Sequence, residues 1–164
     1  MKRLAIVLAL ATMGLTGCAT MYQSRGFTGG YSDTQLAPDV FVVNFNGNGF
    51  TSAERASDFA MLRAADLTEG AGYWYFTVSQ AQDDGTYSTV VMPGYSNTTV
   101  HGYGYGNSFH ATATTWGTGP IAIPIFKPRS KLMIHCYHDK PPGVQAFDAS
   151  FIETSIRSKY GIKG

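Results

Sequence analysis

The chain has 164 residues, a formal net charge of +1, 14% charged residues and 19 glycines. This length suits one domain with a substantial core, and the balanced charge excludes an electrostatic case for binding nucleic acid. The two cysteines, Cys18 and Cys136, are too few for a disulfide scaffold.

Residues 1–17 predict a signal peptide. A basic start precedes an uncharged apolar run over 4–15, which is too short to span a bilayer. The run ends in Leu15-Thr16-Gly17-Cys18, a sequence similar to the lipobox of bacterial lipoprotein precursors. Small Gly17 suits a tight protease site, and the Cys18 thiol is the nucleophile that carries diacylglycerol. Cleavage near Ala11-Thr12-Met13, with an incidental Cys18, is the alternative.

Lipidation of Cys18 predicts stable membrane anchoring through more than one acyl chain, palmitate included. Residue 19 is Ala rather than Asp, which favours the outer membrane over retention at the inner membrane. Loss of the leader removes Lys2 and Arg3, so the mature chain keeps ten basic and eleven acidic side chains. Its one remaining thiol, Cys136, then has no cysteine with which to form an internal disulfide.

Residues 18–38 form a polar, glycine-containing stretch without hydrophobic periodicity. We interpret it as the lipidated N-terminus followed by a tether. A flexible coil of about 20 residues reaches roughly 25 Å, which would hold a domain away from the lipid headgroups. The alternative is that Tyr31–Leu36 packs along the domain as an edge segment.

Residues 40–79 predict a strand, a helix and a second strand. Apolar side chains alternate over Val40–Phe45, which is the period of a strand. Thr51 and Glu54 have the spacing of a capping box, and Gly70 can end the helix. Tyr73–Ser79 is rich in aromatic and β-branched residues, as strands are. If the two strands share a sheet, this βαβ order predicts a right-handed crossover. The apolar helix face comprises Ala56, Phe59, Ala60, Ala64 and Leu67.

The C-terminal part predicts one more strand and one more helix. Lys131–His138 is the strand, with Leu132, Ile134 and Cys136 on one face. Asp148 is the expected N-cap of the last helix, which ends at Gly161. The apolar stripe of this helix comprises Ile152, Ile156 and Tyr160.

Residues 85–126 contain no Asp, Glu, Lys or Arg in 42 positions, but eleven Ser and Thr and seven aromatic residues. Disordered linkers are usually charged and poor in aromatics, so this composition favours a β insertion. Its predicted strands are Tyr87–Met92, Thr98–Val100 and Ala111–Trp116, with a mobile tip around His101–His110.

Two interpretations of this insertion stay open. It is either a hairpin extension that covers sheet edges, or an uncharged surface for a sugar polymer or a protein strand. Aromatic rings offer large rigid contact areas for such a surface. The candidate contact residues are Tyr95, Tyr103, Tyr105 and Trp116.

Chemical sites are weakly indicated. His135 and His138 are candidate metal ligands, with His101 and His110 as further ligands. On a strand, however, His135 faces away from Cys136 and His138, and paired metal-binding spacings are missing from the sequence. We therefore predict no metal and no cofactor, and expect Cys136 to be a core residue.

An enzyme is also disfavoured. The sequence has no nucleophile elbow of the form GxSxG and no phosphate-binding glycine loop before a helix. Nearly all of its carboxylates have an explanation as helix caps, turn residues or solvent-facing side chains. A glycosidase would need two of them on either side of a cleft.

Four segments of the chain stand out together: Gly30–Phe45, Gly47–Ser52, Glu54–Arg55 and Arg63–Thr68. In these segments the chain resembles a group of small proteobacterial lipoproteins of unknown function. The resemblance covers the leader and the first strand, helix and strand well, the last strand and helix loosely, and the Gly/Tyr-rich region poorly. It implies a lipid-anchored envelope protein and transfers no activity.

The sequence thus predicts a single α+β domain over 39–164, built as a two-layer sandwich. A mixed sheet would carry two amphipathic helices on one face and the Gly/Tyr-rich hairpin insertion over 85–126. The predicted function is a non-enzymatic, lipid-anchored interaction or structural module, facing the periplasm from the outer membrane. Its partners would be the membrane and an envelope protein or glycan. A periplasmic ligand-binding domain, for a glycan or a metal, is the alternative.

Overall fold

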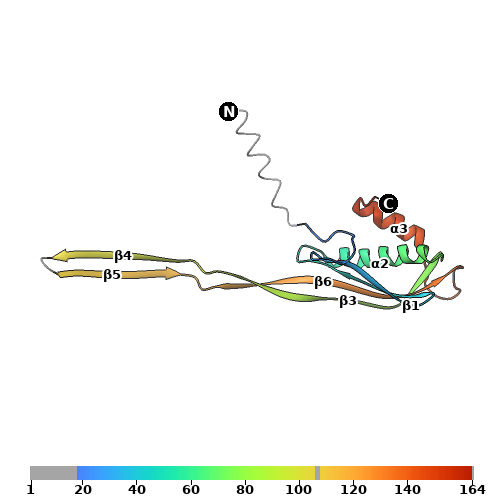
Figure 1. Cartoon of the computed structure of the whole chain (residues 1–164), viewed down its shortest axis with the longest axis horizontal. Helices are drawn as coiled ribbons and strands as arrows, with labels where there is room; N and C mark the ends of the chain where they lie inside the picture. The colour runs from blue at the N-terminus through green and yellow to red at the C-terminus, as the bar shows by residue number, and fades with distance from the viewer. Residues whose placement is uncertain (1–17, 106–107, 164) are drawn as a thin grey trace, which may run out of the picture. The chain divides into compact units, whose positions relative to one another are not determined.

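The computed structural model describes residues 18–105 and 108–163, so the predicted signal peptide over 1–17 lies outside the described residues. The chain is α+β, as predicted, with two helices, a mostly antiparallel sheet of five strands and a separate two-stranded sheet (Figure 1). The elements in chain order are β1 (Gly30–Ala37), β2 (Val40–Asn46), α2 (Ala53–Gly70), β3 (Tyr75–Met92), β4 (Ser96–Tyr105), β5 (Ser108–Gly117), β6 (Ile121–Tyr137), β7 (Phe147–Asp148) and α3 (Ala149–Tyr160).

The chain divides into two compact units. Unit 1 runs up to Thr86 and resumes at Phe126, and unit 2 comprises Tyr87–Ile125. The limits of unit 2 lie within two residues of the uncharged segment over 85–126. This change in composition along the sequence therefore coincides with a structural boundary.

The five-stranded sheet has the order β1-β2-β6-β3-β7. The predicted order of strand, helix and strand is found as β2, α2 and β3, but β6 lies between the two strands. β2 pairs antiparallel with β6 in a register that sets Val43 opposite Leu132 and Phe41 opposite Ile134. Alternation along β2 buries Phe41, Val43 and Phe45, as the period of two predicted.

Helix α2 places its apolar face in the core and packs beside α3. Phe59 is fully buried and makes edge-to-face contacts with Phe45 at 5.2 Å and Tyr160 at 4.9 Å between ring centroids. The predicted positions Ala56, Ala60 and Ala64 are buried with it. Small alanines bring the helix close to the sheet, and Phe59 fills the remaining space.

The cap of α2 differs from the prediction by one residue. Ser52, not Thr51, is the N-cap, and its hydroxyl accepts from Arg55 N at 3.1 Å. The helix continues through Gly70, and Ala71 is its C-cap. At the start of α3 the expected cap is present, because the Asp148 carboxylate accepts from Phe151 N at 3.0 Å. Gly161 ends α3 with a positive φ of 65°, also as predicted.

The prediction of a flexible tether over 18–38 is wrong for most of that segment. Gly30–Ala37 forms β1, the edge strand beside β2, so the edge alternative describes it correctly. Gly29 and Gly30 have φ values of 103° and 127°, and a Cβ on Gly30 would lie 2.4 Å from the Gln23 oxygen. This close turn brings residues 20–28 back onto unit 1.

In unit 2, β4 and β5 pair antiparallel from Ser96 opposite Gly117 to Tyr105 opposite Ser108. The strands are longer than predicted and take in most of the expected tip over His101–His110. Every residue of unit 2 with a described burial is exposed or half-buried. An isolated two-stranded sheet is marginally stable in water, so unit 2 has little internal stabilisation.

Candidate functional site

The predicted lipidation site lies at the start of the described chain. Cys18 is exposed, and its carbonyl oxygen accepts a hydrogen bond from Asn48 Nδ2 at 2.9 Å. Asn48 belongs to the loop between β2 and α2. The cysteine is therefore held on the surface of unit 1 rather than at the far end of a coil.

Thr20, two residues later, fixes this attachment. It is 1% exposed, and its backbone N–H donates to Thr51 Oγ1 at 2.9 Å. Its hydroxyl donates to the Thr28 carbonyl at 2.8 Å and accepts from Asn48 N at 2.9 Å. A buried threonine with its polar groups paired holds this segment against unit 1.

Tyr22 extends the attachment into the core. Its ring lies 5.6 Å from that of Phe59 and 4.8 Å from that of Tyr31, between centroids. Its hydroxyl donates to Asp66 Oδ2 on α2. Burial raises the pKa of the Tyr22 hydroxyl, and the Asp66 carboxylate raises it further, so the phenol stays protonated and keeps this hydrogen bond.

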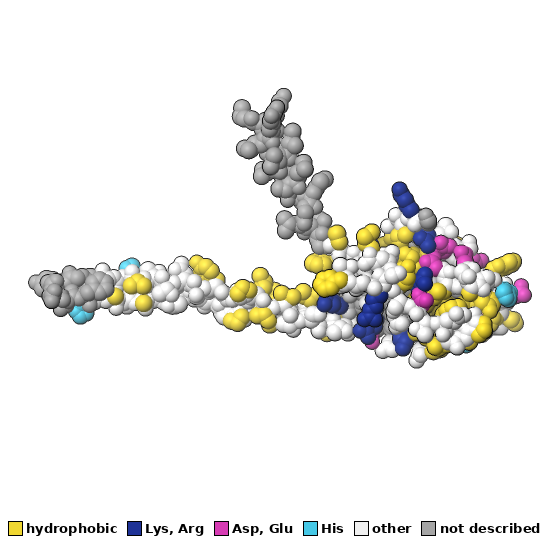
Figure 2. All heavy atoms as spheres, in the orientation of Figure 1, with side chains coloured by type: hydrophobic (Ala, Val, Ile, Leu, Met, Phe, Trp, Pro, Cys, Tyr) yellow, Lys and Arg dark blue, Asp and Glu magenta, His cyan; other side chains and the backbone are white. Residues whose placement is uncertain are grey.

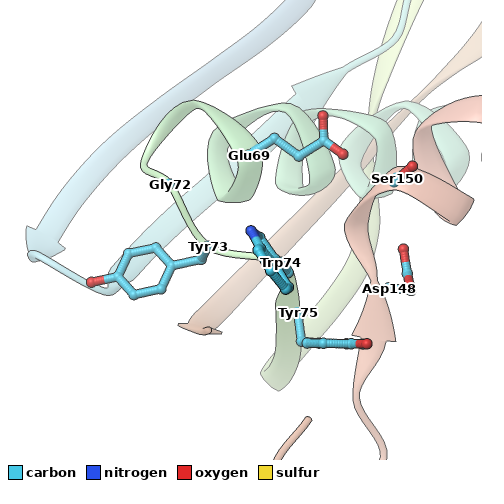
Figure 3. Close-up of a pocket in the computed structure, with 7 residues that line it drawn as sticks. All are labelled: Glu69, Gly72, Tyr73, Trp74, Tyr75, Asp148 and Ser150. Atoms are coloured by element: carbon cyan, nitrogen blue, oxygen red, sulfur yellow. The ribbon is translucent and has the colours of Figure 1, made fainter. Parts of the chain in front are cut away.

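A second candidate is a cleft of about 400 Å³ in unit 1, where α2 ends, β3 begins and α3 begins (Figure 3). Trp74 N donates to Tyr137 O, and Trp74 O accepts from Ala149 N, both at 3.0 Å. These bonds fix the backbone and leave the Trp74 side chain 68% exposed at the cleft. The lining residues are Glu69, Gly72, Tyr73, Trp74, Tyr75, Asp148 and Ser150.

The cleft combines an exposed aromatic ring with carboxylates. Figure 3 shows the Glu69 side chain reaching from α2 across the top of the cleft, with Tyr75 pointing toward Asp148 and Tyr73 pointing the other way. Burial raises the pKa of Glu69, and the nearby carboxylates of Glu153 and Asp148 raise it further. An indole face beside hydrogen-bond acceptors suits a ligand with an apolar face and hydroxyl donors, such as a sugar ring.

The predicted contact residues of unit 2 are described in part. Tyr95 and Trp116 are 70% and 76% exposed. Thr118 N donates to Tyr95 O at 2.9 Å, and Trp116 pairs with Asn97, so the register sets the two aromatics on one face. The backbone of Tyr103 pairs with that of His110, whereas the side chains of Tyr103 and Tyr105 lie outside the described residues.

The histidines and Cys136 have separate surroundings. Cys136 is 2% exposed, lies 3.4 Å from Thr68 Oγ1 and is a core residue as predicted. Burial raises the pKa of its thiol. His138 stacks on Tyr73 at 4.5 Å between centroids, and His135 is half-buried opposite Val40. Within the described ranges, no three His, Cys, Asp or Glu side chains form a group that could hold a metal.

Sequence reasoning missed two parts of these sites. The anchoring role of Thr20 had no local signal, because its partners come from other segments. The cleft had one signal, the run Tyr73-Trp74-Tyr75, since three successive aromatics cannot all face one core.

Comparison with protein-family models, curated proteins and solved structures finds no match to this chain. In the described part of the chain, neither helix combines the length and apolar character needed to cross a bilayer.

Proposed function

We propose that this chain is a non-enzymatic, lipid-anchored protein of the cell envelope, held by acyl chains on Cys18 and facing the periplasm from the outer membrane. It acts as an interaction module whose partner contacts unit 2. A diacylglycerol thioether and palmitate on Cys18 would supply the anchor. The lipobox sequence, Ala19 and the exposed position of Cys18 support this part of the proposal.

The observation that carries the interaction role is the exposure of unit 2. Its described residues include no buried side chain, although many are large and apolar. A two-stranded sheet of this kind is stabilised when a partner covers it, and exposed apolar patches mark such contacts. Its exposed large hydrophobic residues are Tyr87, Val90, Val91, Met92, Tyr95, Val100, Trp116, Ile121 and Ile123.

The finer architecture belongs to the same proposal. We propose a two-layer sandwich with a mixed sheet, both helices on one of its faces and unit 2 as a hairpin insertion. The packing of α2 against α3 and the burial of one face of β2 support this arrangement. In this proposal unit 1 carries the lipid anchor and unit 2 carries the surface that the partner contacts.

Palmitate labelling in cells tests the anchor, and photocrosslinking in the same cells tests the interaction. We expect label on the wild type and on Cys136→Ser but not on Cys18→Ser. A photoreactive residue at Trp116 or Tyr95 should give a discrete crosslinked protein, whereas the matched probe at Phe151, also exposed but on α3, should not. Equal crosslinks at all three positions, or none at Trp116 and Tyr95, would contradict a partner on unit 2.

Glycan binding is the second candidate function, and the exposed Trp74 ring beside Glu69 favours it. If the cleft holds a sugar polymer, peptidoglycan fragments should quench or shift the tryptophan fluorescence of the full chain, and Trp74→Ala should abolish the response. Trp116→Ala, the matched loss of the other tryptophan, should leave it unchanged. A response that survives Trp74→Ala would place the glycan elsewhere.

A further inference from the structure

Because Cys18 lies close to the folded part of unit 1, lipidation of this cysteine would bring unit 1 close to the membrane surface. Thr20 is buried in unit 1, and Cys18 precedes it by two residues, which span at most about 7 Å. The Asn48 side chain also bonds to the Cys18 carbonyl. Acyl chains on this cysteine would therefore hold the surrounding surface of unit 1 at the level of the lipid headgroups.

Exposed apolar side chains lie in the segments that hold Cys18. Phe50 is 70% exposed, and its N–H donates at 3.0 Å to Oδ1 of Asn48, the residue that also binds Cys18. Phe27 is fully exposed and lines a groove together with Asn48, and Met21 is 66% exposed. Aromatic and apolar side chains of this kind are stabilised at the boundary between headgroups and acyl chains.

Basic side chains lie beside these apolar groups. Arg25 and Lys127 line the same groove as Phe27. On β6, Lys127 and Arg129 alternate with buried Pro128 and Ser130, so the two cations share the outer face of the strand. Figure 2 shows Lys and Arg side chains gathered next to apolar ones on the face of unit 1 turned to the viewer.

These cations keep their charge available for an external partner. The ion pairs found among the described residues use Arg63, Arg157 and Lys159 as their cations, and none uses Arg25, Lys127 or Arg129. Arg129 Nε instead donates to the neutral Asn46 side chain at 2.9 Å. Basic groups beside apolar groups match an anionic bilayer surface in both charge and polarity.

We infer that this surface docks directly onto an anionic phospholipid bilayer, so that unit 1 lies on the membrane instead of standing off it. The inference rests on the proposed anchoring through Cys18 and adds the orientation of the domain and the lipid class that it contacts. We call this surface the docking patch, formed by Met21, Arg25, Phe27, Phe50, Lys127 and Arg129.

The test uses the lipidated protein from cells, reconstituted into vesicles of phosphatidylethanolamine and phosphatidylglycerol. An environment-sensitive dye is attached to Phe27→Cys or Phe50→Cys, and to Phe151→Cys on α3 as the matched exposed control. Native Cys136 is buried and Cys18 carries the lipid, so the new cysteine is the reactive one. Docking predicts a blue-shifted dye that nitroxide lipids quench at positions 27 and 50, but not at 151.

Charge removal gives a second measurement. Loss of two cations near an anionic surface, as in Arg25→Ser with Lys127→Ser, should lower the ratio of docked to undocked protein about 30-fold. Vesicles of phosphatidylcholine alone remove the attraction for all three cations of the docking patch, so they should lower the ratio at least as much. The matched control, Lys140→Ser with Lys163→Ser, should leave the ratio unchanged.

The outcomes separate the two proposals. Palmitate label with equal, weak quenching at all three positions would overturn docking and leave the lipid anchor intact. Lack of palmitate label would refute the anchor itself, and the docking inference would fall with it. Quenching at 27 and 50 that is insensitive to charge removal would contradict the choice of an anionic lipid.

Discussion

If the hydrogen bonds of Thr20 attach the N-terminal segment to unit 1, the substitution Thr20→Val should lower the free energy of unfolding by a definite amount. Valine has nearly the same shape as threonine but lacks the hydroxyl, so packing is kept and hydrogen bonding is lost. In the native chain this hydroxyl donates to the Thr28 carbonyl at 2.8 Å and accepts from Asn48 N and the Thr51 hydroxyl. The substitution therefore isolates the polar contribution to the anchor.

The size of the effect follows from which partners are left unpaired. Asn48 N still has Thr51 Oγ1 as an acceptor at 3.2 Å, and the Thr51 hydroxyl still has Asn48 Oδ1 at 2.9 Å. Only the Thr28 carbonyl loses its donor. One unsatisfied group of this kind costs about 1–2 kcal/mol, so Thr20→Val should lower the free energy of unfolding by that amount.

Urea denaturation of the full chain measures this loss, and hydrogen exchange locates it. Exchange should accelerate at the Arg25 and Tyr31 amides, which bond within the segment, while α2 stays protected. Thr34→Val on the exposed part of β1 is the matched control and should change stability by less than about 0.5 kcal/mol. If Thr20→Val is no more destabilising than Thr34→Val, the segment is a tether and the reasoning from its hydrogen bonds fails.

Three further predictions concern unit 1. Phe59→Ala should lower the free energy of unfolding, measured by urea denaturation, by about 3–5 kcal/mol, because it leaves a cavity where α2, α3 and β2 meet. Phe151→Ala, at an exposed position, should change it little. Burial raises the pKa of the Cys136 thiol in the folded state. The free energy of unfolding should therefore be unaffected by this thiol below its unfolded pKa near 9 and should fall as pH rises past that value, and Cys136→Ala should flatten that fall. Burial also raises the pKa of Glu69 in the folded state, so the free energy of unfolding should fall as pH rises past the unfolded value near 4.5. Glu69→Gln should therefore stabilise the chain at neutral pH, whereas Asp139→Asn, at an exposed carboxylate outside the ion pairs found among the described residues, should not.

Signals contained within one segment predicted local structure well. The alternation over Val40–Phe45 identified β2, because burial of one face imposes a period of two on the residues themselves. Asp148 and Gly161 identified the ends of α3, since the groups that each cap satisfies lie within a few residues. Cys136 was correctly assigned to the core from its neighbours on β6.

Structure that depends on distant partners was not predictable from the sequence. Thr51 and Ser52 are both residue types that cap helices. Ser52 is the N-cap of α2 in the structure, whereas the Thr51 hydroxyl contacts that of Thr20, 31 residues earlier. The same contact changes residues 20–28 from a tether into part of unit 1. The cleft at Trp74 requires the start of α3, so composition around Tyr73–Ser79 indicated only a strand.

Intact-mass analysis of the chain purified from membranes tests the lipid anchor most directly, because it reports the cleavage site and the attached group together. The expected mature chain begins at Cys18 and carries the added mass of diacylglycerol and an acyl chain, which fragmentation should assign to that residue. An unmodified Cys18, or a mature chain that begins at another residue, would contradict the proposed anchor and the membrane orientation inferred from it.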